Sequence, residues 1–270
     1  MALRDITLGQ YFPGDTPIHR LDPRTKILLV VLFITAVLLA KTVTAYLLLL
    51  AVLTAVVLLS KVGFKALLRG MRPVLMIVAI TGLLNLFYTP GKGEPLVQFW
   101  IMRIYVEGIF ATIFMVLRIA LLISCTFLLT YTTSPILLTD GLEKLLGPLK
   151  RLGVPIHELA MMMSIALRFI PNLIEETDKI MSAQKARGAD FDTGNLMDKA
   201  KALVPLLVPL FISAFRRADE LAVAMECRCY HGGEGRTRLR QLRMRPADGL
   251  ALCLGVLLCA GTWALGVWGL

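Results

Sequence analysis

Two arginine-bearing segments are the strongest candidates for a functional site in this sequence. Residues 177–188 can be laid over residues 218–229 with a constant offset of 41, which brings Arg187 onto Arg228. The same offset pairs Asp178 with Asp219, Ile180 with Leu221, and Ala183 with Ala224. Positions 180, 183 and 187 share one face of a helix, so each segment predicts a helix whose stripe of apolar and small residues ends at one arginine. A guanidinium can pair with a carboxylate through two hydrogen bonds, so the repeat predicts two matched anchors for acidic grooves on a partner.

An arginine at the end of a helix also has a simpler explanation. The helix dipole and the free carbonyls of the last turn favour a basic residue there by about 0.3–1 kcal/mol. That explanation accounts well for one arginine, and less well for two at the same phase of similar helices. Gly188, and Gly232–Gly233 in the second segment, are predicted to stop the helices. From these residues alone, both interpretations stay open.

Other chemistry has weaker support in the sequence. Cys227, Cys229 and His231 could supply three metal ligands, but a fourth ligand is not evident. The sequence has no Gly-x-x-x-x-Gly-Lys-Ser/Thr loop to cradle ATP phosphates, and no Ser/His/Asp set or carboxylate cluster. We therefore predict no catalytic residue, no metal site and no cofactor, and we do not expect an enzyme. The energy for any active process must come from a partner.

The composition indicates that the chain that carries these arginines is embedded in a membrane. The chain is 57% hydrophobic and 18% charged, against about a quarter charged in soluble domains. The charges are also separated from long apolar stretches, because a charge at the bilayer centre costs roughly 2.5–3.5 kcal/mol. Basic residues gather in cytoplasmic loops beside anionic lipid, which explains the net charge of +10 without a nucleic-acid partner.

Apolar segments predict about five transmembrane helices. The run 27–59 predicts a hairpin of two helices that turns at Lys41–Thr42, and three further spans are predicted at Pro73–Tyr88, Glu107–Tyr131 and Gly249–Leu270. Between the fourth and last spans, prolines interrupt apolar stretches that are too short to cross a membrane. These are predicted as helices buried against protein or lying at the interface.

The predicted fold is therefore an all-α polytopic membrane protein in three regions. They are an N-terminal membrane region with four spans at 1–132, a cytoplasmic or interfacial helical region at 133–248, and a C-terminal span at 249–270. The segments rich in Lys and Arg are the N-terminal segment, loop 60–72 and region 140–248, whereas the opposite loops hold only Lys41, Lys92 and Arg103. The positive-inside rule then places the N-terminus and both repeat arginines in the cytoplasm and the C-terminus outside. Arg118, within the fourth span, is expected to face protein or to snorkel.

Three segments, in order, resemble the transmembrane T-component of energy-coupling factor transporters, the EcfT family, which includes the cobalt-transporter membrane subunits. Ile18–Lys26 resembles the family's entry to its first span, and Ala166–Pro171 resembles the start of its first long coupling helix. The triplet Ala186-Arg187-Gly188 is similar to the first of two short arginine motifs. The second motif departs from Ala-Arg-Gly and has the sequence Cys227-Arg228-Cys229.

The resemblance implies two long coupling helices before the last span and a role in ATP-driven uptake of a vitamin or metal ion. Each arginine motif would dock on one of two cytoplasmic ATP-binding subunits. The implied docking residues are Ala186, Arg187, Gly188, Cys227, Arg228 and Cys229. A separate substrate-binding membrane protein, the S-component, would contact deformable apolar residues, predicted as Met161, Met162, Leu206 and Pro209. Ordinary packing between helices explains those residues equally well. The resemblance also implies the bacterial cytoplasmic (inner) membrane, with the lipid bilayer around the spans.

Two other functions stay open. A stand-alone channel or membrane-embedded enzyme would need polar residues within the spans, where Asn85, Glu107 and Arg118 are few. A subunit of an ordinary ABC importer that binds its own substrate would need a pocket lined by the spans. The form of the N-terminal segment favours a module shared by several vitamin-binding partners over a dedicated cobalt or nickel system.

Overall fold

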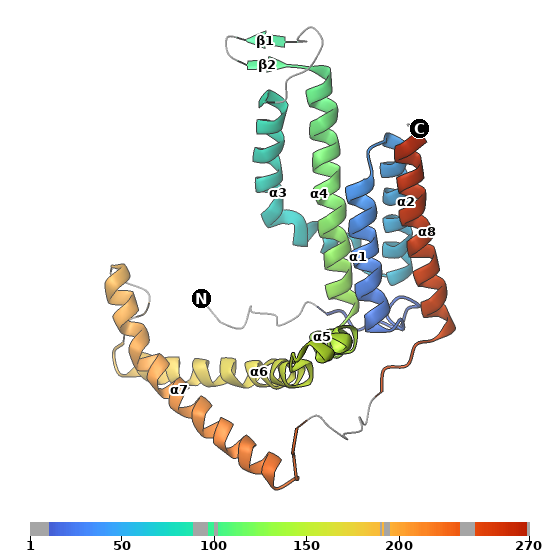
Figure 1. Cartoon of the computed structure of the whole chain (residues 1–270). Coiled ribbons are helices and arrows are strands. Elements are labelled where there is room, and N and C mark those ends of the chain that lie inside the picture. Colours follow the sequence, from blue (N-terminus) through green and yellow to red (C-terminus); the bar gives the residue numbers. More distant parts are fainter. Residues whose placement is uncertain are drawn as a thin grey trace. The chain divides into compact units, whose positions relative to one another are not determined.

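The structure is a computed structural model that describes residues 11–88, 97–99, 102–189, 191, 195–232 and 241–268 (Figure 1). Its elements, in chain order, are α1 (Pro23–Leu39), α2 (Val43–Ser60), α3 (Phe64–Tyr88), the strands β1 (Val97–Phe99) and β2 (Met102–Ile104), α4 (Val106–Thr132), α5 (Pro135–Leu146), the 3-10 helix η2 (Gly147–Leu152), α6 (Ile156–Ala186), α7 (Leu196–Glu226) and α8 (Pro246–Trp268). Two compact units divide them, one over Gly9–Gly141 and Leu242–Leu270, and one over Leu142–Gln241. We call these the membrane unit and the coupling unit and describe each separately.

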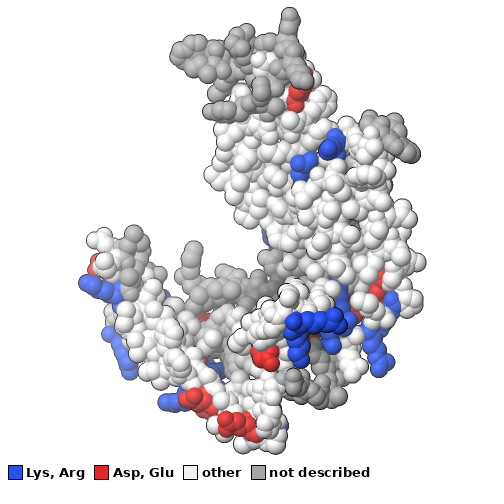
Figure 2. Space-filling view, in the orientation of Figure 1, with Lys and Arg blue, Asp and Glu red and all other residues white. Residues whose placement is uncertain are grey.

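The membrane unit confirms an all-α polytopic fold. The described helices α2, α3, α4 and α8 are long and apolar enough to cross a membrane. Helix α1 has 17 residues, at the short end of the range for a span. In the view of Figure 2, the sides of the membrane helices are almost free of charge, and Lys, Arg, Asp and Glu gather near their ends.

The predicted boundaries are right at the first hairpin and wrong at the third span. Helix α1 ends at Leu39 and Thr42 caps α2 by accepting a hydrogen bond from the Ala45 N–H, which confirms the turn at Lys41–Thr42. Helix α3 begins at Phe64, so Pro73 lies inside the helix rather than at its start. Proline removes one backbone hydrogen bond from a helix, but the rest of the apolar helix can continue past it. The short β1–β2 hairpin was not predicted from the sequence.

A core of small and aromatic residues holds α1, α2 and α4 together. Ala36 and Leu49 are fully buried in it, and small residues let membrane helices approach closely. The Tyr46 and Phe114 rings stack with their centroids 5.1 Å apart. Arg118 donates from Nε to the Tyr46 hydroxyl at 2.9 Å and from Nη2 to the Ala40 carbonyl at 3.3 Å. Arg118 therefore faces protein, as predicted, and satisfies a carbonyl at the free C-terminal end of α1.

The entry segment Ile18–Lys26 joins α1 to the end of α4. The Lys26 ammonium donates to the His19 carbonyl at 3.2 Å, the Thr132 carbonyl at 2.9 Å and the Thr133 hydroxyl at 3.2 Å. All three hydrogens of the buried ammonium are thus used, so its burial is compensated. The segment predicted to open the first span therefore connects the start of α1 to the C-terminal end of α4.

The coupling unit is dominated by α6 and α7, which have 31 residues each and cross each other (Figure 1). They confirm the two long helices that the resemblance implied before the last span. Prolines were predicted to kink or begin the helices of this region, and Pro171, Pro205 and Pro209 all lie inside α6 and α7 rather than at their starts. Because Pro209 has no N–H, the Pro205 carbonyl lacks its usual helical partner. The Gln184 side chain of α6 donates to that carbonyl at 3.3 Å. A contact between the two helices thus replaces a hydrogen bond that proline removes.

Candidate functional site

Helix α6 ends in a Schellman cap at the first arginine motif. The Arg187 N–H donates to the Gln184 carbonyl, the Gly188 N–H to the Lys185 carbonyl, and the Ala189 N–H again to the Gln184 carbonyl, each at 3.0 Å. This pattern requires a left-handed residue just after the helix, and Gly188 supplies it with φ of 88°. The glycine of the motif therefore stops the helix, and Arg187 is the C-cap residue that directly follows the last helical residue, Ala186.

Helix α7 ends in the same cap, shifted by 41 residues. Arg228 donates to the Met225 carbonyl at 3.1 Å, Cys229 to Glu226 at 2.8 Å, and Tyr230 to Met225 at 3.1 Å. Cys229 takes the left-handed position, with φ of 54°. The repeat predicted from the sequence thus extends to each hydrogen bond of the two caps. The predicted stop at Gly232 is wrong, because α7 already ends at Glu226 and Cys229 takes the left-handed position where the first motif has glycine. Gly233, predicted together with it, lies outside the described residues.

The cap geometry predicts opposite effects for two substitutions. Gly188→Val should speed amide hydrogen exchange at residues 186–189 about tenfold, since a side chain in the left-handed region costs roughly 1–2 kcal/mol. Cys229→Gly should slow exchange at the end of α7 by a few fold, because glycine carries no such cost. Gly147→Ala is the matched control, since Gly147 also has open space around it but no positive φ. Equal exchange in all three variants, measured by mass spectrometry, would contradict this account.

Both repeat arginines present free charges. Arg187 and Arg228 are exposed, and within the described residues neither guanidinium has an ion-pair or hydrogen-bond partner. Ile180 and Leu221 are half-buried in equivalent positions. The remaining predicted docking residues, Ala186, Gly188, Cys227 and Cys229, are exposed as well. The structure therefore leaves each motif accessible at the end of a rigid helix.

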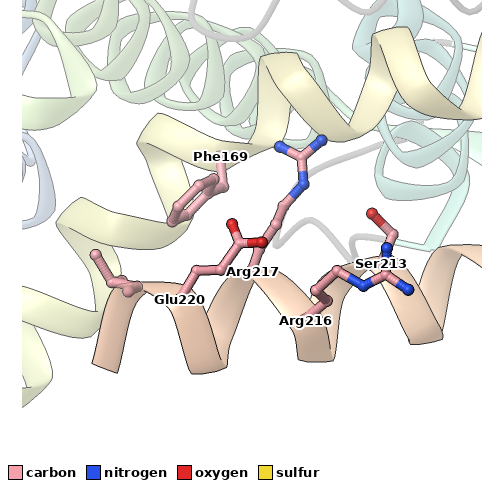
Figure 3. A pocket seen from close by; sticks show the side chains of 6 residues that line it. Phe169, Ser213, Arg216, Arg217 and Glu220 are labelled. Carbon is pink, nitrogen blue, oxygen red and sulfur yellow. The ribbon is translucent and has the colours of Figure 1, made fainter. Parts of the chain in front are cut away.

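An ion pair that sequence reasoning missed lies where α6 and α7 cross. Arg217 Nη2 is 2.7 Å from Glu176 Oε2, and both side chains are partly buried, at 35% and 22% exposure. Beside it is a cavity of 490 Å³ lined by Phe169 of α6 and by Ser213, Arg216, Arg217, Glu220 and Leu221 of α7 (Figure 3). The offset of 41 could have indicated this pair, because it carries residue 176 onto residue 217.

The predicted apolar contact residues are not equally available. Met162 is 55% exposed and Met161 and Pro209 are half-buried, but Leu206 is 5% exposed and points its side chain inward. A broader exposed apolar face surrounds Leu206 on α7, formed by Leu203, Val204, Leu207, Val208, Phe211, Ile212 and Phe215. A contiguous apolar surface of this kind marks a contact with protein or membrane.

Neither of the remaining candidate sites gathers polar ligands. Cys227 and Cys229 are free thiols, and in the described part of the chain no three His, Cys, Asp or Glu side chains converge as metal ligands do. In the membrane unit, a cavity of 590 Å³ is lined by apolar side chains of α1, α2, α4 and α8, with Lys26 and Thr132 as its polar contributors. The Lys26 ammonium is already bonded to protein oxygens. This cavity therefore does not fit a polar substrate.

Comparison with known proteins gives one consistent result. A family model described as cobalt transport protein, CbiQ, matches residues 14–239. The chain is 53% identical over 268 residues to the energy-coupling factor transporter transmembrane protein EcfT of Clostridium kluyveri, covering 99% of both chains. It is 55% identical to the EcfT protein of Thermosediminibacter oceani, over 96% of this chain and 97% of the relative. The EcfT protein of Bacillus subtilis is 53% identical, over 88% of this chain and 89% of the relative.

Proposed function

We infer the following function because this chain belongs to the EcfT family of energy-coupling factor transporter transmembrane proteins. Its two arginine caps dock on two cytoplasmic ATP-binding subunits. The chain is the multi-pass membrane component of such a transporter. In the proposed mechanism it transmits ATP-driven motion of the two subunits to a separate S-component, for uptake of a vitamin or metal ion. It performs no catalysis itself.

The observation that carries this proposal is the pair of matched helix ends. Two exposed arginines stand at the same position of two caps that share every backbone hydrogen bond. The dipole explanation accounts for a basic residue near a helix end, but it does not require the charge to stay free and exposed on both helices. Two equal anchors fit a pair of similar partner subunits, each with an acidic groove.

Helices α6 and α7 connect these anchors to the exposed apolar face and would transmit the motion between them. A helix of 31 residues is about 46 Å long and moves as a stiff rod. When the ATP-binding subunits close, the helix ends move with them. The exposed face of α7 around Leu207 and Phe211, with Met162 on α6, would pass that motion to the S-component. Apolar and methionine-rich surfaces suit a partner that slides or exchanges.

Copurification tests the proposal directly. The tagged chain, extracted from bacterial membranes in mild detergent, should bring down two ATP-binding subunits and a small membrane protein. Reconstituted alone in proteoliposomes, it should move no solute and hydrolyse no ATP. Transport by the purified chain alone would contradict the proposal and favour the stand-alone channel or enzyme.

The proposed orientation places the coupling unit in the cytoplasm. Cys227 and Cys229 are exposed and should react with a membrane-impermeant maleimide in inverted vesicles but not in right-side-out vesicles, when the chain is expressed without ATP-binding subunits. A Lys41→Cys variant should show the reverse sidedness, because Lys41 lies in the turn between the first two helices. The Cys227→Ser/Cys229→Ser double variant should lose the labelling. Labelling of the native thiols from outside would overturn the proposed topology.

A further inference from the structure

The ion pair at the crossing of α6 and α7 joins two residues that the repeat makes equivalent. Glu176 and Arg217 are separated by the offset of 41 that also relates Arg187 to Arg228. In a pair of repeated elements related by a twofold axis, a residue contacts its own equivalent only where the axis passes through the contact. The Glu176–Arg217 pair therefore lies where a local twofold axis relating α6 to α7 would pass.

A second contact has the direction that a twofold axis requires. Gln184, on the C-terminal side of Glu176 in α6, bonds to the Pro205 carbonyl, on the N-terminal side of Arg217 in α7. On the other side of the pair, Phe169 of α6 lines the same cavity as Leu221 of α7 (Figure 3). The helices thus run in opposite directions across the contact, with the ion pair between the two outer contacts.

Counted from the ion pair, the two helix arms that end in the arginine motifs are equal in length. Arg187 lies eleven residues beyond Glu176, and Arg228 lies eleven residues beyond Arg217, so each arm is about 16 Å long. With equal arms, rotation about the ion pair moves both arginines by the same amount. Sliding of one helix by a single residue, about 1.5 Å, would instead shorten one arm and lengthen the other.

The chemistry of the contact resists sliding. One guanidinium nitrogen meets one carboxylate oxygen at 2.7 Å, and this charge-assisted hydrogen bond is lost when sliding of a helix carries the two atoms out of bonding distance. Both side chains are partly buried, so salt screens the pair less than it screens an exposed pair.

We propose that Glu176 and Arg217 are positioning residues that form the pivot of the coupling unit, keeping the two arginine motifs at matched distances from the crossing. This inference rests on the proposed function in one respect, since it takes Arg187 and Arg228 as the docking groups. The pivot itself is a property of the isolated chain and can be measured there.

Distance measurements between spin labels test the pivot without any partner. The labels go on Ala183→Cys and Ala224→Cys, which are exposed and equivalent in the repeat, in a chain whose five native cysteines are replaced by alanine. Arg217→Gln should broaden the distance distribution about twofold, and the swap Glu176→Arg/Arg217→Glu should restore most of the parent width because it restores the pair. Arg216→Gln, which removes the same charge one residue away, should leave the distribution unchanged.

Transport by the complete complex gives the second readout. Arg217→Gln should lower uptake per ATP hydrolysed by roughly fivefold, as for the loss of about one partly buried ion pair, with recovery in the swap. An unchanged distance distribution in Arg217→Gln, or equal broadening in Arg216→Gln, would overturn the pivot. Altered distances with normal uptake per ATP would overturn its role in coupling. If the proposed function itself were wrong, the parent chain would not copurify with ATP-binding subunits.

Discussion

Replacing both Arg187 and Arg228 with alanine should abolish ATP-driven uptake by the assembled transporter while the chain stays folded in the membrane. Neither guanidinium has a partner within the described residues, and both side chains are exposed. Their removal therefore takes no side-chain hydrogen bond or ion pair away from the described part of the chain. Only the helix-dipole contribution of about 0.3–1 kcal/mol is lost at each position, so the thermal midpoint in detergent should change little. A desolvated arginine anchor at an interface contributes about 2 kcal/mol or more. Loss of two such anchors should reduce the affinity for the ATP-binding subunits by several hundredfold or more.

The single variants and a charge-preserving substitution show what the arginines contribute. Each single alanine variant should retain partial binding, because the other anchor still holds one subunit. Lysine at either position keeps the charge but not the planar pair of donors, so it should restore only part of the affinity. Arg216→Ala is the matched control, an exposed arginine on α7 that lies outside both motifs. Full uptake by the double alanine variant, measured in vesicles with a labelled substrate, would exclude these arginines as the coupling contacts.

The sequence predicted best those features that depend on neighbouring residues. The repeat of 41 residues, the arginine at the end of each repeated helix and the first helical hairpin all follow from local periodicity and charge. The cap at Cys229 was harder to predict, because glycine is the usual left-handed residue and Gly232 offered a conventional stop nearby. In the structure, the hydrogen bonds of Arg228, Cys229 and Tyr230 decide where α7 ends.

Features that depend on distant residues were missed. Pro205 and Pro209 were predicted to kink or begin helices, yet α7 continues through both, and Gln184 of another helix satisfies one freed carbonyl. Leu206 belongs to an apolar stretch in which periodicity alone does not tell the buried side from the exposed side. The packing of α8 against α1 joins segments more than 200 residues apart, and no local pattern indicates it.

One buried carboxylate links the N-terminal ends of α1 and α8 by hydrogen bonds. Asp248, 1% exposed, accepts the Asp22 N–H at 2.8 Å and the Arg245 N–H at 2.7 Å. Asp22 is the N-cap residue of α1, and Arg245 directly precedes α8, which begins at Pro246. A single side chain thus satisfies the N-terminal amides of two helices, where the helix dipoles also favour negative charge.

Asp248→Ala should therefore destabilise the membrane unit more than any surface change. The buried Asp22 N–H would lose its acceptor at about 1–3 kcal/mol, and the partly buried Arg245 N–H would lose its acceptor at a smaller cost. The thermal midpoint in detergent should therefore fall by about 5–10 °C for a chain of this size. Asp248→Glu keeps the charge but moves the carboxylate by one methylene, so it should not reach both amides and should recover only part of the loss. Asp15→Asn is the control, because the Asp15–Arg20 pair is exposed and such pairs contribute about 0–1 kcal/mol. If alanine at position 248 proved as harmless as asparagine at position 15, the N-terminal ends of α1 and α8 would have to be joined by other contacts.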